Sequence, residues 1–188
     1  MKNIMIFGIC RTGKTTFSRM VQENFENYQI IEVDTIISAL QRTVPNVQIG
    51  FIHDNVKENK LPQFLSLLIE KNVVKNGKYM NFVINGDSIM PHDLIKYFNL
   101  ENTIVYYFVN SKLTPEEILE NCRKYDDSTE WTNRRTDEQI LNHMKFYKDI
   151  EKQIIEECDK YKINCIDTSE NRQEIFEKLI QDIRKEIQ

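Results

Sequence analysis

Short apolar runs recur along the chain and are separated by longer stretches in which apolar residues are spaced about three to four positions apart. Continuous apolar or β-branched runs of this length are typical of strands buried on both faces of a sheet. We therefore predict five strands, at residues 4–7, 28–33, 79–84, 103–109 and 163–166.

The stretches between these runs have the spacing of amphipathic helices. The clearest start is at Thr114, where the sequence Thr114-Pro115-Glu116-Glu117 forms a capping box with proline at the first helical position. We expect helices at residues 15–25, 35–42, from 62, after 91, from 115 to about 125, from 136 to about 160, and around 175–183.

Alternating strands and helices predict a parallel sheet with helices on both faces, which is a three-layer α/β sandwich. The sequence shows no internal repeat, low-complexity tract or linker. We therefore expect one domain over residues 1–188.

A phosphate-binding loop lies between the first strand and the first helix. The residues Gly8-Ile9-Cys10-Arg11-Thr12-Gly13-Lys14-Thr15 match the pattern G-x-x-x-x-G-K-[ST]. In this motif the backbone N–H groups and the helix N-terminus surround a β-phosphate. The lysine reaches the β- and γ-phosphates, and the Ser or Thr hydroxyl binds Mg²⁺. A chance match is disfavoured because this one follows a strand and opens a helix, as the motif requires.

Two other residues of this loop allow more than one interpretation. Cys10 could be an acidified, reactive thiol near a helix N-terminus and Lys14, or a small residue that fills space, and the second is favoured. Arg11 could touch a phosphate or point to solvent.

Composition limits the classes of partner. The 188 residues carry a formal charge of −4, which argues against a large nucleic-acid surface. Four cysteines without a CxxC pair indicate free thiols in a reducing compartment rather than a zinc site. No apolar stretch reaches membrane-span length, and the start of the chain lacks a signal-peptide pattern. We expect a cytoplasmic protein with a small-molecule partner, whereas the oligomeric state stays open.

With these features the sequence resembles P-loop kinases of the nucleoside-monophosphate-kinase type, which include adenylate, shikimate and related small-molecule kinases. The resemblance covers nearly the whole chain in the order and length of its elements. It implies the strand order 2-3-1-4-5 and transfer of a phosphoryl group from ATP, with Mg²⁺, to a small acceptor. It also implies an acceptor-binding segment at about 35–60 and a lid at about 125–136. The nucleotide-binding residues that it implies are Gly8, Arg11, Thr12, Gly13, Lys14, Thr15 and Thr16.

The resemblance also assigns roles to residues outside the loop. Asp34, at the end of the second strand, is placed to face the phosphoryl acceptor as a general base or orienting group, although it could also cap the following helix. Arg134 and Arg135 match lid arginines that close over the transferring phosphate. A solvated helix start is the alternative for this pair, but a basic pair there opposes the helix dipole. Arg123 is a weaker candidate, and residues 167–169 match a segment near the adenine.

One position departs from the family pattern. The third strand is followed by Asn85 rather than by the acidic residue that helps to hold Mg²⁺. Asp87 could substitute if the chain turns there, so we predict Thr15 and Asp87 as the metal-binding residues. The departure supports an alternative function, a non-catalytic or regulatory ATP-binding protein. A GTPase switch is less well supported, because the chain lacks an Asn-Lys-x-Asp motif.

The acceptor cannot be identified from the sequence, because residues 35–60 carry no recognisable motif. Arg42 could bind an anionic acceptor, but a surface position is the commoner outcome for arginine. His53 and His92 are interpreted as surface residues. Trp131 is unusual in a polar loop, and we expect it to cover a ligand or to dock on the body of the protein.

Overall fold

The computed structural model describes residues 2–54, 56–76 and 80–187. Its strands are β1 (Asn3–Gly8), β2 (Tyr28–Glu32), β3 (Asn81–Asn85), β4 (Thr103–Val109) and β5 (Asn164–Asp167). All strand pairs are parallel, and the order is β2-β3-β1-β4-β5. This confirms the predicted topology. Tyr79, where the third strand was expected to start, lies outside the described residues.

The helices lie where the amphipathic spacing predicts them, within a few residues. They are α1 (Lys14–Asn24), α2 (Val33–Thr43), α3 (Leu61–Asn76), α4 (Pro91–Tyr97), α5 (Pro115–Tyr125), α6 (Asp137–Tyr161) and α7 (Arg172–Ile187). Two 3₁₀ turns, η1 (Ile52–Asp54) and η2 (Trp131–Arg134), lie in the segments expected to be the acceptor region and the lid. The segment before α6, expected to be a loop throughout, therefore contains one helical turn.

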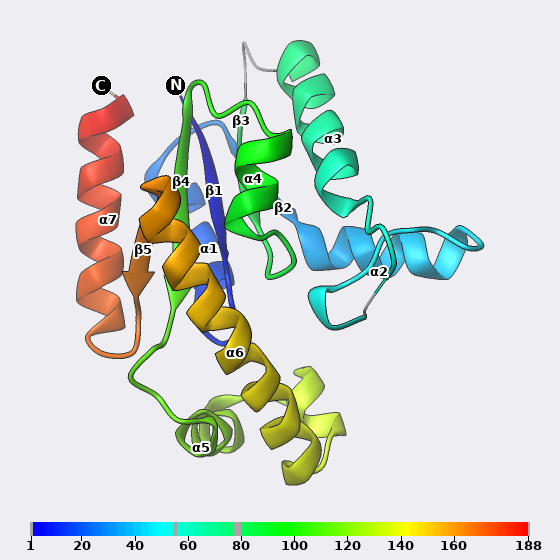
Figure 1. Ribbon diagram of the computed structural model, residues 1–188. Coiled ribbons are helices and arrows are strands. Elements are labelled where there is room, and N and C mark those ends of the chain that lie inside the picture. Colours follow the sequence, from blue (N-terminus) through cyan, green and yellow to red (C-terminus); the bar gives the residue numbers. More distant parts are fainter. Residues whose placement is uncertain (1, 55, 77–79, 188) are drawn as a thin grey trace.

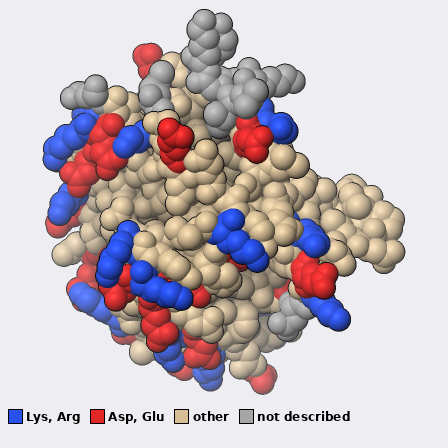
Figure 2. Space-filling model, turned by 45° about the horizontal axis from the view of Figure 1, so that its top comes forward, with Lys and Arg blue, Asp and Glu red and all other residues tan. Residues whose placement is uncertain are grey.

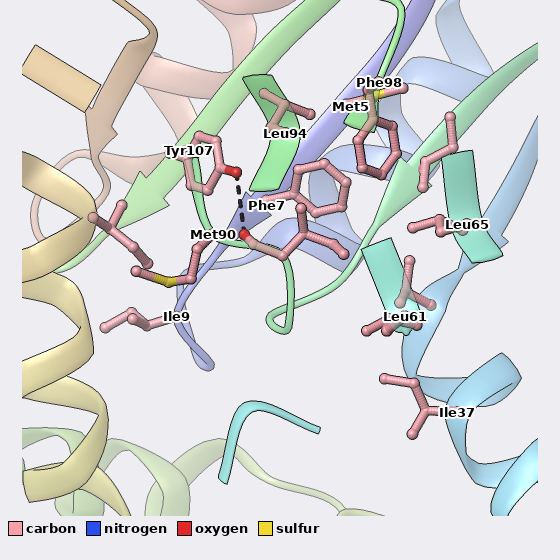
Figure 3. Packing of buried hydrophobic residues seen from close by; sticks show 14 of the residues in the cluster. Met5, Phe7, Ile9, Ile37, Leu61, Leu65, Met90, Leu94, Phe98 and Tyr107 are labelled. Carbon is pink, nitrogen blue, oxygen red and sulfur yellow. Dashed lines mark hydrogen bonds between the residues drawn. The ribbon is translucent and has the colours of Figure 1, made fainter. Parts of the chain in front are cut away.

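Successive residues of the central strand β1 point into two different cores, as the period of a strand requires. Ile4 and Ile6 pack in a cluster with Phe17 of α1 and Phe176 of α7. On the other face, Met5 and Phe7 pack with residues of α2, α3, α4 and α6. Figure 3 shows this second cluster, in which the buried Tyr107 hydroxyl donates to the Ile89 carbonyl at 3.1 Å. Helices thus cover both faces of the sheet, in three layers (Figure 1).

Two of the helices that begin beyond the carboxyl ends of the strands, α5 and α6, have strong local start signals. Thr114 and Thr136 each cap their helix, α5 and α6, in a capping box with Glu117 and Gln139 respectively. In Figure 1, α5, η2 and the first turns of α6 lie beyond the carboxyl ends of the strands. This edge of an open parallel sheet is where α/β proteins bind ligands.

The visible surface carries charges of both signs. In Figure 2, Lys and Arg side chains lie beside Asp and Glu side chains over this face. Among the helices in the described part of the chain, none is long and apolar enough to cross a membrane.

Candidate active site

A cleft of about 1130 Å³ opens at the carboxyl edge of the sheet. It is bordered by the phosphate loop, α2, the segment after β3, α5, η2 and α6. A volume of this size can hold a nucleotide together with a second small molecule. The predicted site residues that line it are Arg11, Gly13, Lys14, Thr15, Thr16, Asp34, Asp87 and Arg135.

The phosphate loop has the backbone geometry that its glycines predict. Gly8 and Gly13 have φ values of 121° and 88°, a region that favours glycine. A Cβ at Gly8 would overlap the carbonyl oxygen of Phe108, its neighbour on β4. Arg11 also has a positive φ, of 65°, so the loop reverses direction before α1 begins. This alternation can turn successive N–H groups toward one anion.

Side chains from the loop and from the β5–α7 connection hold this shape. The buried Thr12 hydroxyl donates to the Ile9 carbonyl at 3.0 Å. The Thr168 hydroxyl donates to the Thr12 carbonyl, also at 3.0 Å, and Arg172 donates to the Arg11 carbonyl at 3.2 Å. Because its hydroxyl is used inside the loop, Thr12 is available to a nucleotide only through its backbone.

Lys14, the first residue of α1, is largely buried and bends back over the loop. Its ammonium group donates to the Ile9 carbonyl at 2.5 Å. Thr15 and Thr16 follow on the exposed side of the helix and line the cleft. The lysine and the two hydroxyls are thus presented together at the N-terminus of one helix.

Arg11 lines the cleft and forms ion pairs there instead of pointing freely to solvent. Its guanidinium forms an ion pair with Asp126 and a second with Glu130, at 3.4 Å. Both carboxylates belong to the segment between α5 and α6. Arg11 therefore links the phosphate loop to the predicted lid, and its binding to a phosphate stays a prediction.

Cys10 has the properties of a space-filling residue. Its thiol donates to the Met144 sulfur at 3.7 Å. Burial first, and the nearby Asp87 second, raise the pKa of Cys10 to about 12. The thiol is therefore protonated at neutral pH, and the reactive-thiolate interpretation does not hold.

Asp34 faces the cleft, although its local structure differs from the prediction. Strand β2 ends at Glu32, and Asp34 lies in the first turn of α2 rather than at the strand end. The helix cap is Glu32, without a side-chain capping bond, so Asp34 is not the N-cap. Desolvation by the cleft walls and the neighbouring Asp87 raise the pKa of Asp34 to about 7, while Lys14 opposes this shift. The carboxyl is open to solvent on the cleft side and can be reached by a ligand.

Asn85 and Asp87 have separate tasks at the end of β3. Asn85 is buried and donates to the Ser18 hydroxyl at 2.9 Å, which ties β3 to α1. Two residues later the chain has turned, and Asp87 lines the cleft. Its carboxylate accepts from the Tyr147 hydroxyl at 2.7 Å and from the Ser88 hydroxyl at 2.8 Å.

The donor set near the loop suits magnesium held mainly by phosphates. The described residues contain no group of three or more His, Cys, Asp or Glu side chains arranged for a metal. Thr15 and Asp87 both offer oxygen atoms to the same cleft. Mg²⁺ in nucleotide sites commonly uses one or two such oxygens, with substrate phosphates and water as its other ligands. The residues present can therefore hold Mg²⁺, and the assignment of Thr15 and Asp87 as its ligands stays a prediction.

The predicted lid segment is held by Arg123. Its guanidinium pairs with Asp137 at 2.7 Å and donates to the carbonyls of Thr132 and Arg135 at 3.0 and 2.8 Å. Arg135 lines the cleft, whereas Arg134 is exposed and is not among the lining residues. The structure therefore separates two adjacent arginines that the sequence treats alike.

Five aromatic side chains, Phe51, His53, Trp131, His143 and Tyr147, form a continuous wall of the cleft, which we call the aromatic wall. Phe51 and His53 stack with their centroids 5.3 Å apart and an angle of 9° between the rings. The ring centroid of His143 lies 5.2 Å from that of His53, 4.9 Å from that of Trp131 and 4.7 Å from that of Tyr147. The wall thus runs from η1 across α6 to η2.

Sequence reasoning found only part of this wall. Trp131 was expected to cover a ligand or to dock on the protein body, and it packs against His143 at the cleft. His53 is exposed, as predicted, and it also lines the cleft, which the sequence did not indicate. His143 was missed, and the available signal was its position one helical turn before Tyr147. Arg42 is exposed at the end of α2 and is not among the lining residues.

Comparison with known proteins places this cleft in a family context. No family model matches the chain. A shikimate kinase from Thermoanaerobacter pseudethanolicus is 29% identical over 130 residues, which cover 68% of each chain. One from Caldicellulosiruptor saccharolyticus is 29% identical over 164 residues, covering 82% of this chain and 86% of the relative.

A solved structure agrees in fold. The crystal structure of a shikimate kinase from Bacteroides thetaiotaomicron superposes with a TM-score of 0.59 at 12% identity, covering 99% of this chain and 98% of the other. At this identity the likeness concerns the fold alone. Taken with the two sequence relatives, the phosphate loop and the 2-3-1-4-5 sheet, it indicates a P-loop small-molecule kinase.

Proposed function

We propose that this protein transfers the γ-phosphoryl group of Mg·ATP to a hydroxyl group of a small acceptor. The observation that carries the proposal is that Lys14, at the phosphate loop, and Asp34, on α2, face the same cleft. A phosphate-binding group and a carboxyl that can accept a proton are the two parts that a hydroxyl-directed kinase needs.

The phosphate loop and α1 would bind the triphosphate. The backbone N–H groups of residues 8–15 would surround the β-phosphate, and Lys14 would leave its Ile9 contact to reach the β- and γ-phosphates. Mg²⁺, held by Thr15 and Asp87 with the phosphates, would neutralise charge on the transferring group. The sequence relatives are shikimate kinases, which supports the use of ATP, and these residue roles are our proposal.

Asp34 would act on the acceptor. The acceptor oxygen attacks the γ-phosphorus, the bond from the γ-phosphorus to the β–γ bridging oxygen breaks, and ADP leaves. Asp34 takes the proton of the attacking hydroxyl. Because its pKa is raised to about 7, the carboxyl is basic enough to accept this proton and is still largely ionised at slightly alkaline pH.

The lid would supply the remaining positive charge. Arg135 lines the cleft and is placed to stabilise charge on the transferring phosphoryl group. We assign residues 35–60 to the acceptor side, because Ser38, Phe51 and His53 line the cleft there. We also propose that residues 1–188 act as one catalytic domain in the cytoplasm, where the free cysteines stay reduced.

A non-catalytic ATP-binding protein is the second candidate, and the observation in its favour is Asn85. The structure provides an alternative to the missing carboxylate, since Asp87 reaches the cleft from the same loop. The two functions differ in turnover. A binding protein would hold ATP without acceptor-dependent formation of ADP.

The test is ADP formation from Mg·ATP with and without hydroxylated acceptors. Stimulation by an acceptor, and its loss by 10³-fold or more in Lys14→Ala, is the expected result, since this lysine is part of the loop's phosphate-binding machinery. Lys152→Ala, at an exposed lysine of α6, is the matched control and should keep full activity. Nucleotide binding without stimulation by any acceptor, or full activity in Lys14→Ala, would refute the proposal.

A further inference from the structure

The acceptor side of the cleft has an unusual composition for an anion-binding pocket. Its wall is aromatic, and a carboxylate, that of Asp87, is hydrogen-bonded to the wall. Tyr147 donates to Asp87 at 2.7 Å, and His53 Nδ1 lies 3.4 Å from the same Tyr147 hydroxyl. Burial, Asp87 and Asp34 all raise the pKa of Tyr147, so both carboxyls lie near this ring.

His143, at the centre of the aromatic wall, carries no positive charge at neutral pH. Burial lowers the pKa of His143, and His53 and Arg135 lower it further, against the opposing effect of Asp87. His143 is therefore neutral and presents a planar ring between Trp131 and Tyr147. Stacking on such rings contributes to the binding of planar ligands.

Most of the positively charged side chains that line the cleft are not available to an anionic acceptor, because they are already paired or lie at the phosphate loop. Arg11 pairs with Asp126 and Glu130. Arg172 donates to the carbonyls of Thr168 and Arg11, and Lys14 sits at the phosphate loop. Among the cleft-lining residues in the described ranges, this leaves Arg135 as the cation nearest the acceptor side, and the transferring phosphoryl group requires one there. An anionic acceptor would face Asp34 and Asp87 without a cation of its own.

The aromatic wall is also distinct from the side expected to bind the adenine of ATP. The wall is anchored at the loop after β3, where Tyr147 bonds Asp87 and the Ile52 N–H donates to Ser88 at 3.2 Å. The segment expected near adenine, residues 167–169, follows β5. Strands β1 and β4 lie between β3 and β5, which at about 4.8 Å per strand is a separation of roughly 14 Å. One base cannot occupy both places.

From this geometry we infer that the acceptor is a hydroxylated molecule with a planar aromatic ring and no anionic group, stacked on the aromatic wall with its hydroxyl at Asp34. A nucleoside has this chemistry, whereas a nucleoside monophosphate or a hydroxylated carboxylic acid does not. The inference names the acceptor class of the proposed kinase and rests on that function for the role of Asp34. Stacking on the wall is a binding event and can be measured without turnover.

Binding of uridine to the protein saturated with a non-hydrolysable ATP analogue tests the inference directly, because the analogue fills the nucleotide side. Calorimetry compares uridine with ribose, which lacks the ring, with UMP, which adds a phosphate, and with shikimate, a hydroxylated carboxylic acid. We expect uridine to bind at least about tenfold more tightly than each of the other three. Trp131 is the single tryptophan of the chain, so its fluorescence should change with uridine and not with ribose.

Variants of Trp131 separate stacking from general damage. Trp131→Leu should weaken uridine binding by about tenfold, and Trp131→Phe should restore it to within about threefold, since it keeps an aromatic ring. Tyr161→Ala is the matched control, at the aromatic residue that ends α6 and is not among the lining residues. It should leave uridine binding unchanged.

The outcomes distinguish this inference from the proposed function. Tighter binding of UMP or shikimate than of uridine, equal binding of ribose, or no binding of uridine would overturn the aromatic-acceptor inference. If shikimate or UMP then stimulates ADP formation, the kinase proposal holds although the aromatic-acceptor inference fails. If uridine binds at the wall but no acceptor stimulates ADP formation, the inference about the wall holds and the kinase proposal fails.

Discussion

The two sides of the cleft are built in different ways. The proposed phosphate side consists of one continuous segment, residues 8–16, which would contact a ligand largely through backbone groups set by two glycines and a helix N-terminus. The proposed acceptor side is assembled from α2, η1, η2 and α6, and it would contact a ligand through side chains. A site made by local backbone geometry can be read from a motif, whereas one made by distant side chains depends on packing.

The largest effect is expected at Gly8, which tests how strictly the phosphate side depends on backbone geometry. In Gly8→Ala the new Cβ would meet backbone atoms of Phe108 at a φ of 121°, and neither strand can move away cheaply. We expect loss of nucleotide binding and a fall in the free energy of unfolding of about 4 kcal/mol or more, measured by denaturant titration.

Gly13→Ala provides the graded comparison for this prediction. Its Cβ would lie 2.9 Å from the Phe176 ring, and a side chain can shift more easily than a strand. The loss of stability should therefore be smaller than in Gly8→Ala. Equal stability of Gly8→Ala and the unmodified protein would show that the loop tolerates another geometry.

Asp34 tests the acceptor side at its proposed chemical centre. Asp34→Asn should lower kcat by roughly 10²–10³-fold with the KM for ATP unchanged, because only the proton acceptor is lost. In the unmodified protein kcat should fall about tenfold per pH unit below about 7, the pKa of Asp34, and this dependence should be absent from the variant. Glu23→Gln, at an exposed carboxylate of α1, is the control and should keep both rate and profile.

The same substitution should stabilise the fold. A carboxyl whose pKa is raised in the folded state disfavours folding once it ionises, so its cost grows from about pH 4 to about pH 7 and stays constant above. Solvent on the cleft side screens this cost, so we expect a gain of about 1 kcal/mol in Asp34→Asn at pH 8 and little at pH 4. Unchanged kcat with unchanged stability would remove Asp34 from the mechanism.

The two lid arginines form a matched pair with an intermediate expected effect. Arg135 lines the cleft, and Arg134 does not. Arg135→Gln should lower kcat by roughly 10–100-fold through lost stabilisation of the transferring group, and Arg134→Gln should stay within about twofold. Steady-state kinetics with saturating ATP measures both. The reverse order would show that the lid closes in another orientation.

The smallest effect is expected where the two sides meet, at the bond between Tyr147 and Asp87. Tyr147→Phe removes a donor at 2.7 Å from a nearly buried carboxylate while keeping the ring of the aromatic wall. We expect the free energy of unfolding to fall by about 1.5 kcal/mol and kcat by about threefold, because Asp87 loses a partner that orients it. Loss of uridine stacking in this variant would instead assign the hydroxyl, rather than the ring, to acceptor binding.

Most of the scaffold was predictable, for reasons visible in particular elements. The β1 sequence is apolar at consecutive positions because helices cover both of its faces, and this gave the correct strand. The capping box at Thr114 marked the start of α5 correctly. The exact start of α2 was missed, since Val33 has strand propensity but is the first buried residue of the helix.

The residues of the candidate site were predictable to different degrees. Lys14 and Thr15 follow from the motif, but the ion pairs of Arg11 do not, because Asp126 and Glu130 lie within its reach only in the folded chain. His143 and His53 are 90 positions apart, and their contact depends on η1 lying against α6. Periodicity assigns a residue to a face of its own helix, and it carries no information about the partner across the cleft.

By itself, the sequence determined the order of strands and helices, the covered sheet and the phosphate loop, because these depend on the local periodicity of apolar residues and on glycine positions. Tertiary structure alone decided that Asp87 reaches the cleft beside Asn85, that Arg135 and not Arg134 lines it, and that five aromatic rings form one wall. These outcomes depend on distances between segments remote in sequence, and packing of the whole chain sets those distances.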